Sequence, residues 1–270
     1  MAASPLLDLN GIDKSFGPVQ VLHDVGLKVY AGEVTALVGD KGAGKSTLVK
    51  CVSGIYTIDA GTVTFDGQQV AIHSPRDASA LGIEVVYQDL ALCDNLDIVQ
   101  NMFLGREKVR GLVLDEPTME QMAGDTLASL SVRTVKSLRQ LVASLSGGQR
   151  QTVAIAKAVL WNSRVVILDE PTAALGVAQT SQVLELVRRL ADNGLGVVLI
   201  SHNMNDVFAV SDRIAALYLG RTAAQVKTSD VTHSQIVELI TSGRSGNLGL
   251  AQESPADLNG GIDITPGGVQ

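Results

Sequence analysis

Residues 33–47 read EVTALVGDKGAGKST, an apolar run that leads directly into a glycine-rich segment and a lysine–serine pair. Residues 39–46 fit the pattern G-x-x-x-x-G-K-[ST], in which backbone N–H groups curl around phosphate oxygens and the following helix adds partial positive charge. We therefore expect a buried strand, a phosphate-binding turn and a helix from Lys45 to about residue 53. The alternative is an ordinary glycine-rich turn between a strand and a helix.

The side chains of this loop indicate how a triphosphate would be held. Lys45 would reach the β- and γ-phosphates, and the Ser46 hydroxyl would coordinate Mg²⁺. The residues expected to bind the nucleotide through this loop are Gly39, Asp40, Lys41, Gly42, Ala43, Gly44, Lys45, Ser46 and Thr47.

A second apolar run ends in two acids. Residues 164–170 read RVVILDE, which is typical of a buried central strand that delivers carboxylates to the ligand-binding edge of a parallel sheet. Asp169 can hold Mg²⁺, directly or through water, and Glu170 can polarise an attacking water molecule. In the alternative interpretation, both acids only cap the helix that follows.

The pentapeptide LDEPT occurs at residues 114–118 and again at residues 168–172. Only three apolar residues (112–114) precede Asp115 and helix-forming residues follow the first copy, so we expect Asp115 to be a helix N-cap with Pro117 in the first turn. The second copy is therefore the expected end of an active-site strand.

The spacing of apolar residues divides the chain into different kinds of structure. Alternation before residue 30 predicts antiparallel strands, and strands alternating with helices after residue 163 predict a mostly parallel sheet covered by helices. Between them, helical spacing predicts an inserted helical subdomain. The pairs at this spacing are Leu127/Leu130, Leu138/Leu141 and Ile155/Val159. Residues 244–270 lack periodicity and are expected to form a flexible tail.

Composition excludes several classes of protein. The 270 residues are 46% hydrophobic and 18% charged, so the chain folds rather than remaining disordered. With 28 acidic and 21 basic residues the net charge is −7, so no bulk attraction to nucleic acid is expected and an anion must be held locally. The chain has only two cysteines, no apolar run of about 20 residues and no export signal, which indicates a mature cytosolic sequence.

Residues 145–149 read LSGGQ and precede a helix of small and apolar residues, so they form a second candidate anion-binding helix N-terminus. This motif lies between the phosphate loop and the acidic strand end, and with that order the sequence resembles the nucleotide-binding subunits of ABC transporters over about residues 5–243. The resemblance implies an α/β fold, a P-loop NTPase core of mostly parallel sheet with an N-terminal antiparallel β subdomain and an inserted α-helical subdomain. The implied nucleotide-binding domain covers residues 5–243, with its core in residues 5–94 and 163–243 and its helical subdomain in about residues 95–162.

The resemblance also implies roles for residues outside the phosphate loop. Phe16 would stack on adenine, Gln88 would sense Mg²⁺ and the attacking water, and His202 would contact the γ-phosphate. The alternatives are a strand core residue for Phe16 and a solvated loop residue for Gln88. The implied catalytic residues are Glu170, His202 and Gln88, and the implied Mg²⁺ ligands are Ser46, Gln88 and Asp169. The implied signature residues, which would close the nucleotide site of a second copy, are Leu145, Ser146, Gly147, Gly148 and Gln149.

Residues 81–107 carry a narrower likeness, to the ribose-, xylose- and fructose-type sugar importers. Many relatives in that group carry two cassettes in one chain, whereas this chain carries one, so two copies must assemble. Lys41 stands where such loops commonly have Asn, and Gly176 stands where many ABC cassettes have Asp.

The resemblance implies an ATPase that energises a membrane importer, with a monosaccharide as the expected cargo. ATP would hold two copies together, hydrolysis would open them, and residues 89–107 would transmit the opening to integral membrane permease subunits. An extracytoplasmic sugar-binding protein would be an indirect partner, nucleic acid would not be a partner, and the chain would lie peripherally on the cytoplasmic face of the cell (inner) membrane. The alternatives are a soluble non-transport ABC ATPase, a non-hydrolysing nucleotide switch and an exporter.

Overall fold

The computed structural model describes residues 4–130, 135 and 137–250. A six-stranded sheet forms its centre, in the order β12-β11-β3-β10-β9-β6. These strands are β3 (Val34–Val38), β6 (Ile83–Val86), β9 (Val165–Asp169), β10 (Gly196–Ile200), β11 (Arg213–Tyr218) and β12 (Arg221–Lys227). All neighbouring pairs are parallel except β11 with β12, so the mostly parallel sheet expected from the sequence is confirmed.

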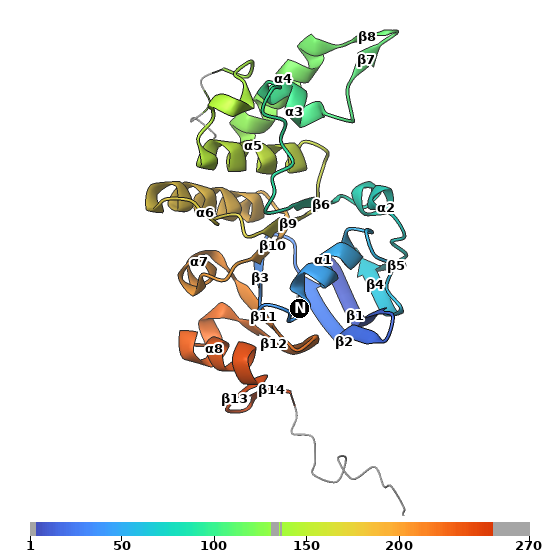
Figure 1. Ribbon diagram of the computed structural model, residues 1–270, viewed down its shortest axis with the longest axis vertical. Coiled ribbons are helices and arrows are strands. Elements are labelled where there is room, and N and C mark those ends of the chain that lie inside the picture. Colours follow the sequence, from blue (N-terminus) through green and yellow to red (C-terminus); the bar gives the residue numbers. More distant parts are fainter. Residues whose placement is uncertain (1–3, 131–134, 136, 251–270) are drawn as a thin grey trace, which may run out of the picture.

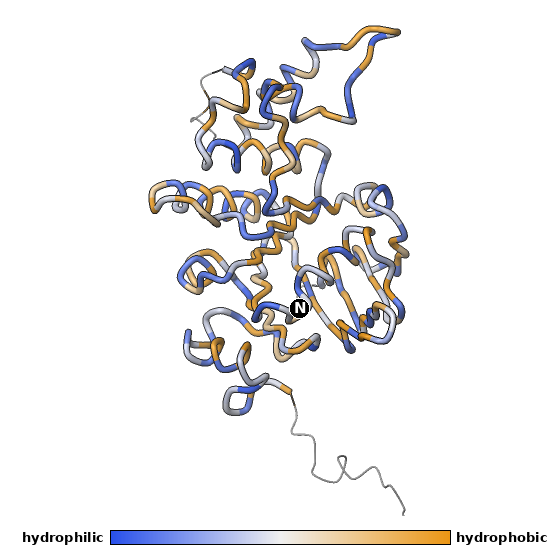
Figure 2. The backbone as a smooth tube through the Cα atoms, in the orientation of Figure 1, coloured by the Kyte–Doolittle hydropathy of each residue, from blue (hydrophilic) through white to orange (hydrophobic). Residues whose placement is uncertain are grey.

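The central strands consist almost entirely of apolar residues because both faces of the sheet are covered. Every residue of β3 and β10 is buried, and Figure 2 shows the hydrophobic residues concentrated in these central strands. In the register of the sheet, Ile200 lies opposite both Leu37 and Asp169. The carboxyl ends of β3, β9 and β10 therefore meet at one edge, and the loops that follow them share a site.

The N-terminal strands form a separate antiparallel sheet, as the sequence predicts, in the order β2-β1-β4-β5. These strands are β1 (Leu7–Phe16), β2 (Val19–Val29), β4 (Ala60–Phe65) and β5 (Gln68–Val70). Helix α1 (Lys45–Val52) packs its apolar side chains into the same cluster of buried residues as these strands, and the short helix α2 (Pro75–Ala80) precedes β6. The phosphate-loop segment thus runs between the two sheets (Figure 1).

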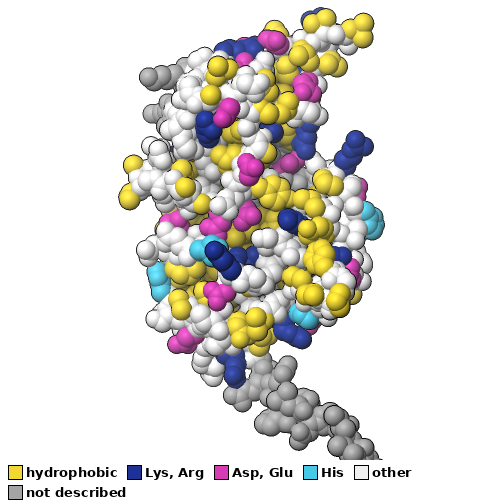
Figure 3. Space-filling model, in the orientation of Figure 1, with side chains coloured by type: hydrophobic (Ala, Val, Ile, Leu, Met, Phe, Trp, Pro, Cys, Tyr) yellow, Lys and Arg dark blue, Asp and Glu magenta, His cyan; other side chains and the backbone are white. Residues whose placement is uncertain are grey.

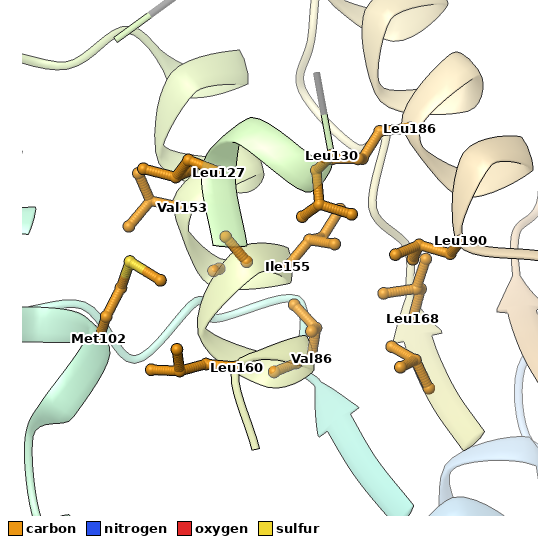
Figure 4. Close-up of a cluster of buried hydrophobic side chains, with 14 of the residues drawn as sticks. Val86, Met102, Leu127, Leu130, Val153, Ile155, Leu160, Leu168, Leu186 and Leu190 are labelled. Atoms are coloured by element: carbon orange, nitrogen blue, oxygen red, sulfur yellow. The ribbon is translucent and has the colours of Figure 1, made fainter. Parts of the chain in front are cut away.

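The helical subdomain lies at one end of the molecule, above the central sheet in Figure 1. Its elements are α3 (Ile98–Phe103), the β7 (Val109–Arg110) and β8 (Val113–Leu114) hairpin, α4 (Glu116–Ser129), the 3₁₀ turn η1 (Val142–Ser144) and α5 (Gly147–Val159). A shared cluster of buried apolar residues joins it to α6 (Val177–Asp192) and β9, and in Figure 4 Leu130 and Ile155 lie near Leu186, Leu190 and Leu168. The subdomain is therefore packed onto the sheet through α5 and α6.

One helical expectation is wrong. Leu138 and Leu141 are at helical spacing, but Leu138 lies outside any helix and Leu141 pairs with Asp97 in an isolated β-bridge. The backbone N–H groups of Val142 and Ala143 donate to the carbonyls of Leu96 and Asp94, so this segment bonds to a distant one instead of to its own preceding turn.

The C-terminal part adds α7 (Met204–Val210), the 3₁₀ turn η2 (Thr228–Asp230), α8 (His233–Ser242) and a hairpin of β13 (Arg244–Ser245) and β14 (Leu248–Gly249). This hairpin contacts α8 and β12, so the described fold extends past residue 243, where the sequence predicts the tail to begin. Residues 251–270 of the expected tail lie outside the described residues. None of the described helices is long and apolar enough to cross a lipid bilayer.

Candidate functional site

The phosphate loop adopts a conformation that requires glycine. Gly39 and Gly44 have φ values of 154° and 101°, where side chains are rarely accommodated. A Cβ atom on Gly39 would lie 2.5 Å from the Leu217 carbonyl oxygen, and one on Gly44 would lie 2.7 Å from Leu22 Cδ2. The turn therefore packs tightly against β2 and β11, and the N-terminus of α1 points into the loop, as the sequence predicts.

The Lys45 side chain folds back over this turn. Its Nζ atom donates to the carbonyl oxygens of Gly39 at 2.5 Å and of Asp40 at 3.0 Å. Burial lowers the pKa of Lys45, and the charges of Glu170, Asp169 and Asp40 act against that shift. The Lys45 amine thus lies at the mouth of the loop, where a phosphate group needs a charge-assisted donor, and Lys41 of the same loop also lines the cavity described below.

Two carboxylates stand at the end of β9. Burial raises the pKa of both Asp169 and Glu170. The charge of Lys45 partly opposes this shift at Asp169, and the charge of His202 partly opposes it at Glu170. Glu170 Oε1 lies 3.0 Å from His202 Nε2, and 17% of the Glu170 side chain is exposed. Oε1 itself is buried and, apart from its contact with His202, has no hydrogen-bond partner among the described residues. This carboxylate oxygen is therefore available to accept a proton from a bound water molecule.

A single cavity of about 300 Å³ connects these groups. It is lined by residues 41–47 of the loop together with Gln88, Asp169, Glu170 and His202, and also by Val21 and Ile200. The structure therefore brings together the loop, the acidic strand end, the glutamine after β6 and the histidine after β10, although they are far apart in the sequence. Val21 was not among the residues expected at the site, because it is one of several alternating valines in β2.

The oxygen donors in this cavity fit Mg²⁺. The side chains of Ser46, Gln88 and Asp169 supply one hydroxyl, one amide and one carboxylate oxygen, which are hard ligands of the kind that Mg²⁺ prefers. In the described part of the chain, no group of three or more His, Cys, Asp or Glu side chains could hold a metal ion alone. Such a sparse set suits an ion that keeps several water molecules and shares phosphate oxygens with the protein.

Phe16 lies at the end of β1 and does not line this cavity. Its ring packs edge-on against Tyr56, with the ring centres 5.0 Å apart, and Lys14 Nζ lies 5.5 Å from the Phe16 ring centre. The side chain is 41% exposed, so it is not the buried core residue of the alternative interpretation. Adenine stacking on its exposed face stays a prediction.

The LSGGQ residues lie at the N-terminus of α5 and do not line the phosphate cavity of their own chain. Ser146 is the N-cap, and its backbone N–H donates to Gln149 Oε1 at 2.9 Å. Added Cβ atoms on Gly147 and Gly148 would lie 3.2 Å from Leu175 Cδ2 and from Gln179 Cβ, respectively. These glycines therefore let α5 approach the segment that follows the Glu170 turn, while Ser146 and Gly147 stay exposed.

The first LDEPT copy has the structural role that the sequence predicts. Asp115 is the N-cap of α4 and accepts a hydrogen bond from the Thr118 N–H, and Pro117 lies in the first turn.

One buried acid close to the site was not predicted from the sequence. Asp206 on α7 is 6% exposed and connects the segments that follow Glu170 and His202. Its only sequence signal is a charged residue in a short helix just after the histidine.

Comparison with known proteins identifies relatives over most of the chain. A family model described as ABC transporter matches residues 22–173. A xylose/arabinose import ATP-binding protein of Sulfolobus acidocaldarius is 42% identical over 250 residues, covering 93% of this chain and 99% of the relative. A fructose import ATP-binding protein of Rhizobium meliloti is 44% identical over 248 residues, covering 89% and 95%. A ribose import ATP-binding protein of Caldanaerobacter subterraneus is 39% identical over 237 residues, which are 87% of this chain and 47% of the relative.

Solved structures of ATP-binding cassettes share the fold. The ADP conformation of one such cassette superimposes with a TM-score of 0.76 at 23% identity, covering 89% of this chain and 96% of that chain. A nucleotide-free cassette gives a TM-score of 0.75 at 24% identity, covering 83% and 91%. Together with the sheet order, these cassettes confirm the P-loop α/β fold expected from the sequence.

Proposed function

Because this chain belongs to the ABC transporter family of ATP-binding proteins, we propose that it hydrolyses ATP to energise the import of a monosaccharide. The relatives that match nearly end to end are named for the import of xylose or arabinose and of fructose. The observation that carries the proposal is the single cavity lined by the phosphate loop, Gln88, Asp169, Glu170 and His202.

Each group in this cavity has a role in the proposed hydrolysis. Lys45 and the N–H groups of the loop bind the β- and γ-phosphates, and His202 contacts the γ-phosphate. Ser46, Gln88 and Asp169 would hold Mg²⁺, which when bound neutralises phosphate charge. Glu170 accepts the proton of the attacking water at Oε1, the buried oxygen that faces His202. Burial supports this role because it raises the pKa of Glu170 above its ordinary range and makes the carboxylate a stronger base.

The cavity is completed by a second copy in this proposal. Ser146 and Gly147 are exposed at the N-terminus of α5, where the helix dipole favours an anion, but they lie outside their own chain's cavity. In a head-to-tail pair, residues 145–149 of each copy would contact the γ-phosphate bound by the other. ATP then links the copies, and hydrolysis releases them.

The proposed contact with the permease subunits lies next to Gln88. A groove of about 230 Å³ is lined by Asp89 and Leu90 after β6, by side chains of α5, by Arg106 after α3 and by Trp161 just after α5. Beside it projects the β7–β8 hairpin (residues 109–114), in which Val109 is 65%, Leu112 103% and Val113 70% exposed. Hydrophobic side chains gather at this projecting end in Figure 3. An exposed apolar cluster of this kind favours a protein contact, and its position links that contact to Gln88.

The proposal also includes the domain that carries the activity and its cellular setting. The domain proposed to carry the activity is residues 5–243, with the helical subdomain at about residues 95–162. The chain lies peripherally on the cytoplasmic face of the membrane, bound to integral permease subunits, and an extracytoplasmic sugar-binding protein is an indirect partner. The sugar itself does not contact this chain.

The proposal is tested by isolating the chain from native membranes and reconstituting it with the spanning subunits that accompany it. Vesicles containing the complex should take up a radiolabelled pentose or hexose only with Mg²⁺ and ATP on the side of this chain. Recovery with ribosomes and without spanning subunits would contradict the proposal and favour a soluble ATPase.

A further inference from the structure

A buried carboxylate connects the two loops that carry Glu170 and His202. Asp206 lies on α7 and is 6% exposed. Its Oδ2 atom accepts a hydrogen bond of 2.7 Å from Thr172 Oγ1, and its Oδ1 atom accepts one of 3.0 Å from Asn203 Nδ2. Both oxygens of this buried anion are thus satisfied by groups from different segments.

The two donors adjoin the catalytic side chains in sequence. Thr172 follows Glu170 by two residues, and Asn203 is the residue after His202. Asn203 is itself fixed, because its backbone N–H donates to Ser201 Oγ at 3.0 Å and its Oδ1 accepts from the Asn205 N–H at 3.0 Å. A shift of either segment would therefore break a hydrogen bond to Asp206.

The Glu170 segment needs such support. Glu170 has φ of 51° and Ala174 has φ of 60°, a conformation that residues with side chains rarely adopt and that persists only when the surroundings hold it. The backbone bonds around this turn join Glu170 N–H to the Ile200 carbonyl at 3.0 Å and Ala173 N–H to the Glu170 carbonyl at 3.1 Å. Neither bond reaches α7. The Thr172–Asp206 bond supplies that link from a side chain.

The His202 side chain is 52% exposed, so packing alone does not fix its position relative to Glu170. Its place is set by the backbone between Ser201 and α7, where Asn203 is the N-cap of the helix. A purely structural role for Asp206 would be to stabilise the N-terminus of α7 through Asn203. That role does not require Thr172, which lies outside the helix.

We propose that Asp206 is a positioning residue, which through Thr172 and Asn203 holds the Glu170 carboxylate and the His202 imidazole at the separation needed for ATP hydrolysis. This inference rests on the proposed function and adds to it a residue that does not line the cavity. Neither Asp206 nor Thr172 would touch the nucleotide in this account. Their loss should therefore lower turnover with little effect on ATP affinity.

The most selective test is Thr172→Val, which removes the hydroxyl while keeping the shape of the side chain. We expect kcat for ATP hydrolysis to fall by about 10-fold or more, because small displacements of reacting groups have large effects on rate, while KM for ATP changes by less than about 2-fold. Thr172→Ser keeps the hydroxyl and should retain kcat within about 3-fold of the wild type. Thermal unfolding of each variant shows whether the fold is intact.

A double mutant separates positioning from general stability. When His202 is replaced by Ala, the pair to be positioned is already lost, so adding Thr172→Val should lower kcat by less than about 2-fold. The positioning role would be overturned if Thr172→Val lowered kcat by the same factor in the His202→Ala background as in the wild type. It would also be overturned if Thr172→Val alone had the kcat of the wild type. Absence of ATP hydrolysis by the wild-type chain with its permease subunits would instead overturn the proposed function.

Discussion

Replacing Glu170 with Gln tests the assignment of the catalytic base. Gln has nearly the same shape, so the packing of the mostly buried side chain is kept while its charge and basicity are lost. Oε1 of Glu170 is buried and lies 3.0 Å from His202 Nε2, so the substitution removes the carboxylate charge at the point where it contacts the imidazole.

The expected loss follows from the role of a general base. Turnover should fall by about 10²–10⁴-fold, which corresponds to about 3–5 kcal/mol of transition-state stabilisation. ATP affinity should be kept or rise, because the variant removes a negative charge that lies near Lys45 and the phosphates. Phosphate release at saturating ATP and Mg²⁺ measures turnover, and equilibrium binding of a fluorescent ATP analogue measures affinity.

The chain provides a matched control in its first LDEPT copy. Glu116 has the same sequence neighbours, but it forms an ion pair of 3.0 Å with Arg139 and its side chain is 52% exposed. Such a surface pair contributes about 0–1 kcal/mol to stability, so Glu116→Gln should leave turnover unchanged. The assignment is refuted if Glu170→Gln keeps turnover within about 3-fold of the wild type, or if Glu116→Gln is the more damaging change.

Three further perturbations address the loop, the buried acids and the hairpin. Lys45→Ala removes the amine at the loop mouth and should weaken ATP binding by about 10-fold or more, since charged hydrogen bonds contribute about 1.5–3 kcal/mol; unchanged affinity in equilibrium binding would contradict the phosphate role. Burial raises the pKa of Glu170, so this carboxyl group stays protonated to a higher pH in the folded chain than in the unfolded chain. The free energy of unfolding therefore falls as the pH rises from the unfolded-state pKa through the folded-state pKa. Glu170→Gln should therefore raise the melting temperature at neutral pH but not at a pH below both pKa values, and an equal gain at both pH values would count against the burial argument. Leu112→Asp combined with Val113→Asp should reduce recovery of the chain with the membrane fraction while basal ATP hydrolysis is unchanged, whereas Val237→Asp on α8, where the side chain is also exposed, should have no effect on either; equal recovery of both variants would exclude the hairpin from the contact.

The phosphate loop and the acidic strand end could be predicted because their structure is determined locally. Glycines at residues 39 and 44 allow the positive φ values of the loop, and the apolar run before Asp169 specifies a buried strand. Parallel strands end at one sheet edge, so the cavity follows once both strands are placed in one sheet. The motif order then identifies Gln88 and His202, which the cavity contains.

Other features depend on contacts between distant segments and could not be inferred from local patterns. The hydrogen bond between Thr172 and Asp206 joins residues 34 positions apart, and neither local sequence indicates that it forms. Leu138 and Leu141 show helical spacing, yet the backbone there bonds to residues 94–97. The exposure of Leu112 likewise depends on how far the hairpin projects from α3 and α4, which the apolar pattern alone does not reveal.

The central claim is that two copies of this chain enclose ATP between the phosphate loop of one and residues 145–149 of the other. Sedimentation velocity of the Glu170→Gln variant, with Mg²⁺ and saturating ATP, tests this most directly, alone and with its permease subunits. The account predicts a dimer that forms with ATP, dissociates with ADP and is lost when Ser146 is replaced by a bulky residue. A variant that binds ATP yet stays monomeric in both settings would contradict it.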